Sequence, residues 1–185
     1  MSLLDLSSAF DTVDHDILLK RLELSFGLQS TSIKWFKSYL TGRSQTISFG
    51  GRESESDSVS CGVPQGSVLG SLLFILHTAD VEKLIRTLGL EVHLYADDTQ
   101  QYCSGKPTDI VSLRQKTVHS VDKVARWMAS NRLRLNASKT ECMWCATTRR
   151  QHLLDLAPIE LNGSAISPST SVRDLGELLS PDMSM

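Results

Sequence analysis

The sequence predicts a mixed α+β domain, in which an antiparallel sheet carries helices packed on one face. Three observations lead to this class. Several segments repeat apolar residues at helical spacing, residues 90 to 103 alternate apolar and polar on both sides of an acidic bend, and the predicted elements follow one another as strand, two helices, ribbon, helix, hairpin, helix and strand. Because hairpins and ribbons pair their strands antiparallel, the helices between them can cover one face of the sheet.

Length and composition are those of one globular domain, or of a piece of a larger protein. The chain has 185 residues, of which 41% are hydrophobic, and it contains no low-complexity block or fixed-period repeat, which excludes the disordered and solenoid classes. The first residues lack the basic region of a signal peptide, and the longest apolar run, VLGSLLFILH, is too short to cross a bilayer. We therefore expect a soluble intracellular protein, nuclear or cytoplasmic, that is not secreted and does not bind a membrane.

The first half of the chain begins with a strand and continues with helices. SLLDLSS predicts a buried strand that ends near Ser7. DHDILLKRLELSFG predicts a helix with acids in its first turn and Gly27 as its stop, and a second helix after QSTS ends at Gly42. Residues 43 to 62 alternate around a Gly-Gly turn and predict a two-stranded ribbon. The apolar stripes of the two helices are Leu18, Leu22 and Phe26, then Ile33, Phe36 and Leu40.

A helical region and a hairpin follow the ribbon. The residues from PQG to Gly89 repeat apolar side chains at helical spacing. Residues 90 to 103 predict a hairpin with the acids Asp97 and Asp98 at its bend. The stripe expected to be buried in the helical region is Val68, Leu72, Ile75 and Ala79.

The remaining residues predict one long helix and further strands. The helix opens at Pro107 and Thr108, and its apolar face is Ile110, Leu113, Val118, Val121, Val124 and Met128. RLRLNASKTECMWCATT predicts a strand, a polar loop follows, and SVRDLGELL predicts a last strand or hairpin.

Four cysteines are scattered without the regular spacing of a disulfide framework, which is typical of reduced thiols inside cells. Cys142 and Cys145 form a CxxC, a spacing that occurs in zinc sites. No second CxxC or histidine pair accompanies it, and its setting, ECMWCATT, is strand-like. Packing of the two cysteines in a strand is therefore the competing interpretation. The net charge of −2 identifies no class of partner.

Two neighbouring acids at a bend need a physical reason. A single Asp is common in turns because its side chain bonds nearby backbone, and this remains the plain explanation for Asp97 or Asp98 taken alone. Two carboxylates a few ångströms apart repel each other unless a cation offsets their charge. Asp5 interrupts the apolar run LLDL and also needs a partner, because an unpaired charge in a buried strand costs several kcal/mol.

If the first strand lies beside the hairpin, the three acids meet. Three carboxylates are hard oxygen ligands that suit Mg²⁺, which keeps further positions for water and phosphate. Two such ions about 4 Å apart are the arrangement that supports phosphoryl transfer. The sequence thus predicts a magnesium site formed by Asp5, Asp97 and Asp98.

Five segments together resemble the palm motifs of reverse transcriptases, in the same order and with similar spacing. In detail they are most similar to the enzymes of LINE-type, non-LTR retrotransposons. The segments are LLDLSSAFDTVDH (motif A, 3–15), the segment containing GVPQGSVLGSLLF (motif B, 61–74), the YADD hairpin (90–103), the region containing LRLNASKTE (motif D, 127–147) and the segment containing VRDLG (motif E-like, 171–179). They span nearly the whole chain.

The resemblance implies RNA-directed DNA synthesis on a palm domain. Asp5 and Asp97 match the principal metal ligands of the family and Asp98 the third acid of the site. The implied cofactor is a pair of Mg²⁺ ions, with Mn²⁺ as a substitute. The implied partners are an RNA template, a DNA primer and a deoxynucleoside triphosphate (dNTP), whose α-phosphate is attacked by the primer 3′-hydroxyl.

Four more residues acquire roles through the resemblance. Phe10 matches the aromatic that excludes a 2′-hydroxyl, Gln65 and Gly66 match the pair that borders the nucleotide, and Lys139 matches a lysine that protonates pyrophosphate. Each residue also has a plain alternative. Phe10 fits a core position, PQG fits a loop that enters a helix, and an isolated lysine usually faces solvent.

The sequence also departs from the family pattern. Glu177 stands where an apolar residue is usual, and Ser71 and His77 replace a proline and an aromatic. Fingers, thumb and endonuclease domains do not fit in a chain of this length, so we expect a palm largely without fingers and thumb, which exposes apolar surface and self-associates. Three functions remain open: a working polymerase palm, a silent transposon relic that keeps the fold, and a two-metal nuclease.

Overall fold

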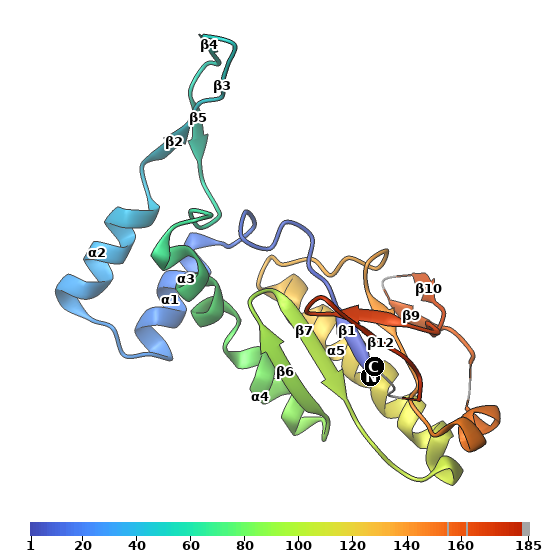
Figure 1. Ribbon diagram of the computed structural model, residues 1–185. Coiled ribbons are helices and arrows are strands. Elements are labelled where there is room, and N and C mark those ends of the chain that lie inside the picture. Colours follow the sequence, from blue (N-terminus) through green and yellow to red (C-terminus); the bar gives the residue numbers. More distant parts are fainter. Residues whose placement is uncertain (155, 162, 183–185) are drawn as a thin grey trace. The chain divides into compact units, whose positions relative to one another are not determined.

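The computed structural model describes residues 1–154, 156–161 and 163–182 (Figure 1). Within it the chain forms two compact units. One unit combines Met1–Ser7 with Asp80–Met185, and the other is Ser8–Ala79. Both contain helices and strands, so the predicted α+β class is confirmed. No helix in the described part of the chain is both long and apolar enough to span a membrane.

The first unit is built on a four-stranded antiparallel sheet. Its strands are β6 (Glu91–Tyr95), β7 (Asp98–Tyr102), β1 (Ser2–Leu4) and β8 (Glu141–Cys142), in the spatial order β6-β7-β1-β8. The predicted hairpin at residues 90 to 103 is therefore confirmed as β6 and β7. The first strand is shorter than predicted, because only an isolated bridge between Leu6 and Leu135 continues it beyond Leu4.

Two helices cover one face of this sheet. They are α4 (Asp80–Thr87), and α5 (Ile110–Ser130), which begins with the 3-10 turn Pro107–Asp109 as the long predicted helix does (Figure 1). Ser120 on α5 donates a 2.6 Å hydrogen bond to the buried Gln101 side chain on β7. The buried side chains of the sheet lie in the rows paired with Gln101 and Thr99, namely Val92, Ser2, Cys142 and Leu4. The alternate residues belong to the opposite, more open face.

The last part of the first unit contains two short hairpins. β9 (Ile159–Leu161) pairs with β10 (Ser164–Ile166), and β11 (Val172–Asp174) pairs with β12 (Glu177–Leu179). The second hairpin was predicted. The first hairpin contradicts the polar loop predicted for this region, which also contains the 3-10 segment Thr148–Leu153, because three-residue strands are too short for alternation to stand out in a sequence.

The second unit consists of three helices and a ribbon. The helices are α1 (His15–Leu24), α2 (Ser30–Leu40) and α3 (Val68–Thr78). The ribbon at 43 to 62 was predicted, and its strands are β2 (Arg43–Gln45) with β5 (Asp57–Val59) and β3 (Ser48–Phe49) with β4 (Arg52–Glu53). Asp14 caps α1 by accepting from Ile17 N–H at 2.9 Å, and Leu18 and Leu22 are fully buried.

The predicted buried stripe of α3 is wrong. Val68, Leu72 and Ile75 are exposed by 93%, 47% and 51%, whereas Leu73 and Phe74 are buried. Apolar residues cover both sides of this helix, so helical spacing alone could not identify the side that packs. Gly70 adds a reason for the observed orientation, since a Cβ there would overlap the carbonyl oxygen of Pro64.

Candidate functional site

The tight turn of the β6-β7 hairpin carries the first two candidate acids. Tyr95 pairs with Asp98, which leaves Ala96 and Asp97 as the two turn residues. Ala96 has a φ of +53°, a left-handed conformation that residues other than glycine adopt mainly in such turns. Asp97 therefore lies at the tip of the hairpin, and Asp98 begins β7 directly beside it.

The register of the sheet brings Asp5 to the same place. β1 runs antiparallel to β7 with Leu4 opposite Thr99, so the next position along β1, Asp5, lies across from Asp98. Directly opposite residues on antiparallel strands have Cα atoms about 4.5–5.5 Å apart. The backbone of Asp5 is also fixed on its other side, where its carbonyl accepts from Asn136 N–H at 2.9 Å. The predicted convergence of residues 5, 97 and 98 is thus a result of strand pairing.

These acids belong to the open face of the sheet. Tyr95 and Asp98 are exposed, and the next residue of β7, Thr99, is buried. The side chain of Asp5 keeps 27% of its surface exposed. Since α4 and α5 occupy the opposite face, Asp98 and the exposed part of the Asp5 side chain can be reached by a ligand that approaches the sheet from its open side.

Burial and neighbouring charges both act on the acids of this site. Burial raises the pKa of Asp5 above its ordinary value, with Asp97 raising it further and Lys139 lowering it. Burial likewise raises the pKa of Asp98, followed by the charges of Asp97, Asp5 and Asp174. In addition, Oδ1 of Asp5 is buried and has no hydrogen-bond partner within the described residues. An unsatisfied carboxylate oxygen beside other acids favours binding of a cation.

Lys139 provides a positive charge at one edge of this group. Its Nζ lies 3.9 Å from Oδ1 of Asp5, and its side chain is 67% exposed. The residue belongs to a turn organised by Asn136, whose side chain accepts from Ser138 N–H and whose carbonyl accepts from Thr140 N–H. At this distance and exposure the ion pair is weak, so the lysine remains available to a more negative partner.

A fourth acid, Asp174, was not identified from the sequence. It ends β11, and its Oδ2 accepts a 2.9 Å hydrogen bond from Gln100 Nε2 on the open face of β7. The sequence marks its segment, VRDLG, only as a motif, and no local signal singles out the acid within it. A small cleft of about 110 Å³ joins these elements, lined by Leu3, Leu4, Asp5, Asp98, Thr99, Gln100, Lys139, Glu141, Arg173, Asp174 and Leu175.

The donor atoms suit a divalent cation, although they are not gathered into a finished coordination sphere. Within the described residues no group of three or more His, Cys, Asp or Glu side chains has the arrangement of a metal site. The chemistry of Asp5, Asp97 and Asp98 nevertheless fits Mg²⁺, which takes carboxylate oxygens and retains several waters. Their mutual repulsion gives the binding of such an ion a favourable electrostatic contribution.

The three predicted nucleotide-binding residues belong to the unit Ser8–Ala79, where they lie near one another. The backbone carbonyl of Phe10 accepts from Val63 N–H at 2.8 Å, shortly before Gln65. Gln65 Nε2 donates to Asp11 Oδ1 at 2.7 Å, and Gly66 has a φ of +74° with open space where a Cβ would point. The half-buried ring of Phe10 packs on Phe74 with centroids 4.9 Å apart.

The CxxC cysteines have different environments. All four cysteines of the chain are free. Cys142 is buried in β8, as the strand interpretation predicted, and burial raises the pKa of its thiol. Cys145 follows the strand and is exposed. Neither belongs to a metal-binding group among the residues that the structure describes, so the zinc interpretation gains no support.

Comparison with known proteins gives consistent matches. A family model described as "Reverse transcriptase (RNA-dependent DNA polymerase)" matches residues 1–179. The RNA-directed DNA polymerase from mobile element jockey of Drosophila funebris is 30% identical over 182 residues, which cover 95% of this chain and 19% of the relative. Its counterpart in Drosophila melanogaster is 28% identical over 94% of the chain.

A third relative matches a shorter stretch. The probable RNA-directed DNA polymerase from transposon X-element of Drosophila melanogaster is 41% identical over 78 residues, or 42% of this chain. The chain spans 19% of the length of each jockey relative.

Proposed function

We propose, because the chain belongs to the reverse transcriptase (RNA-dependent DNA polymerase) family, that it forms the palm of a LINE-type, non-LTR retrotransposon polymerase. In this proposal the five segments named from the sequence are the palm motifs, and the open face of the β6-β7-β1-β8 sheet is the site of nucleotidyl transfer. The observation that carries the proposal is the strand register, which brings Asp5 across from Asp98 and beside Asp97.

Asp5, Asp97 and Asp98 would hold the divalent ions of the reaction, two Mg²⁺ or, as a substitute, Mn²⁺. Bound ions of this kind lower the pKa of an attacking hydroxyl and neutralise the charge of a triphosphate. The protein's own contribution is to hold three carboxylates close together at one end of the sheet. Two observations support this role. Oδ1 of Asp5 has no hydrogen-bond partner among the described residues, and burial together with neighbouring acids raises the pKa values of Asp5 and Asp98, an energetic cost that a bound cation would offset.

The substrates follow from the family. The primer 3′-hydroxyl attacks the α-phosphate of a dNTP on an RNA template, and pyrophosphate leaves. Lys139, which is exposed and loosely paired with Asp5, protonates the leaving pyrophosphate. Phe10 excludes ribonucleotides by contact with the 2′ position, and Gln65 and Gly66 border the base, with the open backbone of Gly66 permitting close approach. Because this chemistry uses RNA and dNTPs, we place the protein inside the cell, in the nucleus or cytoplasm.

Primer extension tests the proposal. The chain is incubated with an RNA template, a labelled DNA primer, four dNTPs and either Mg²⁺ or Mn²⁺. Extension that Asp97→Asn abolishes and Asp122→Asn leaves intact supports the proposal, since Asp122 pairs with Arg126 on the surface of α5. Loss of primer without added dNTPs identifies a nuclease instead.

The second candidate is a catalytically silent relic that keeps the fold. It is favoured by the absence of a finished metal-binding group among the described residues and by the exposed Glu177 at the start of β12, where the family usually has an apolar residue. Phosphoryl transfer depends mainly on positioning and charge, so a palm by itself is expected to extend primers slowly or not at all. Metal binding without extension is the result that this candidate predicts.

A further inference from the structure

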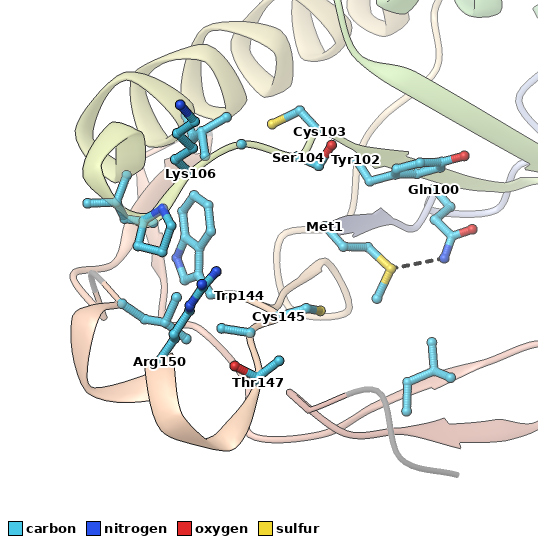
Figure 2. Close-up of a pocket in the computed structure, with 17 residues that line it drawn as sticks. Met1, Gln100, Tyr102, Cys103, Ser104, Lys106, Trp144, Cys145, Thr147 and Arg150 are labelled. Carbon is cyan, nitrogen blue, oxygen red and sulfur yellow. Dashed lines mark hydrogen bonds between the residues drawn. The ribbon is translucent and has the colours of Figure 1, made fainter.

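A second, larger cavity lies in the same unit, toward the end of β7 away from the acidic turn (Figure 2). Its volume is about 550 Å³, within the range of small-molecule sites. Among its described lining residues, only Gln100 also lines the small cleft beside Asp5 and Asp98, which we call the acidic cleft. Its apolar lining includes Pro107, Ile110, Leu113, Leu154 and Leu179.

Trp144 supplies a polar group to this apolar site. Its side chain lines the cavity, and the residue is only 8% exposed. Its Nε1 has no hydrogen-bond partner within the part of the chain that the structure describes. A buried indole N–H normally finds an acceptor, and leaving it without one costs about 1–3 kcal/mol. A ligand with an acceptor atom on a planar ring would satisfy this donor.

The charged side chains among the described lining residues of the cavity are all positive. Lys106 and Arg150 line it, and Figure 2 shows them on either side of the Trp144 indole. No Asp or Glu is present among the described lining residues. Charge complementarity therefore favours an anion, and arginine is well suited to a phosphate or carboxylate because its guanidinium donates from two nitrogens in one plane.

We propose that this cavity binds a planar aromatic anion of the nucleoside monophosphate class. The ring occupies the apolar part of the cavity, an acceptor atom on the ring accepts from Trp144 Nε1–H, and the phosphate binds to Arg150. The ligand is either a free nucleotide or one nucleotide of a single strand, since both present the same ring and phosphate. The proposal does not depend on polymerase activity at the acidic cleft.

Cys145 permits a local test. It is exposed and lines the cavity, whereas the exposed Cys61 belongs to the other unit and serves as an internal reference. The full chain is alkylated in alkaline buffer, because partial burial raises the pKa of the Cys145 thiol, and the two sites are followed by peptide mass spectrometry. AMP, adenosine, inorganic phosphate and a short single-stranded oligonucleotide are the probes.

We expect AMP or the oligonucleotide to slow alkylation of Cys145 and not of Cys61, and the more effective of the two identifies the source of the ligand. Adenosine and phosphate alone protect less. Arg150→Ala weakens protection about tenfold, whereas its neighbour Arg149→Ala, which does not line the cavity, leaves it unchanged. Trp144→Phe keeps an aromatic side chain and removes the N–H donor, and it also weakens protection.

Two results would overturn the proposal. One is that neither AMP nor the oligonucleotide protects Cys145 at millimolar concentration. The other is that Arg150→Ala and Arg149→Ala have equal effects, which would show that protection arises elsewhere. Asp97→Asn should not change protection by AMP, so this outcome and that of primer extension are separable.

Discussion

At the scale of single residues, Asp5 and Asp98 lower the stability of the fold in their ionised form. Burial and neighbouring charges raise both pKa values above the ordinary 3.8. A folded-state pKa above the unfolded one means that the folded protein binds the proton more tightly. Its stability therefore decreases as the pH rises from below 3.8 through the raised folded values. This behaviour is common at sites that function rather than stabilise.

Replacing Asp98 by Asn should therefore stabilise the protein at neutral pH. Because Asp98 is exposed, solvent screening limits the expected gain to about 1 kcal/mol or less. Thermal unfolding in the presence of a chelator should show a higher midpoint for the variant at pH 7 than for the parent. The difference should shrink in acid, where the parent carboxyl is protonated. A lower midpoint at pH 7 would mean that the Asp98 charge is stabilising.

The side chain of Gln100 is a second residue with a specific role. It joins β7 to β11 through its hydrogen bond to Asp174, so Gln100→Ala should release the β11-β12 hairpin from the sheet. Loss of a hydrogen bond to a charged acceptor costs about 1.5–3 kcal/mol, reduced here by partial exposure. Hydrogen exchange should become faster in Val172–Leu179 and stay unchanged in β6. Equal exchange in parent and variant would show that the hairpin is held by other contacts.

At the scale of elements, α3 gives a direct test of which helix face packs. Leu73→Ala removes a fully buried side chain and should destabilise the protein by about 2–5 kcal/mol. Leu72→Ala removes a neighbour that is 47% exposed and should cost less than about 1 kcal/mol. Chemical denaturation of the two variants makes a matched comparison. If the costs were reversed, the stripe expected from the sequence would be the buried one.

The elements also show what the sequence can and cannot predict. The β6-β7 hairpin, α5 and the β11-β12 hairpin were predicted because each combines a clear period with turn residues. The packing side of α3 was not, because its apolar residues surround the helix. The β9-β10 hairpin was missed because its strands have three residues each.

The candidate site was predictable to a similar degree. The resemblance to a family identified Asp5, Asp97 and Asp98 from segments far apart in the chain, and the strand register then explains their meeting. Asp174 could not have been chosen in this way. Its importance depends on a contact with Gln100, 74 positions away, that leaves no local signal in the sequence.

At the scale of the whole molecule, exposed apolar side chains predict self-association. Ile47 and Phe49 on the ribbon are 71% and 88% exposed, and Val68 on α3 is 93% exposed. Apolar side chains exposed to this extent favour contacts between molecules. Sedimentation velocity of the 185-residue chain should show an average mass that increases with concentration, and Phe49→Ser should reduce the effect. A single monomeric species at all concentrations would contradict this prediction.

The central claim is that Asp5 and the Asp97-Asp98 pair form one cation site on the open face of the sheet. Binding of Mn²⁺, measured by the loss of its free electron paramagnetic resonance signal on titration with protein, tests the claim most directly. We predict that the parent chain binds Mn²⁺, that Asp5→Asn and Asp97→Asn each weaken binding at least about tenfold, and that Asp122→Asn on α5 has no effect. Unchanged binding by Asp5→Asn, with loss in Asp97→Asn, would contradict it.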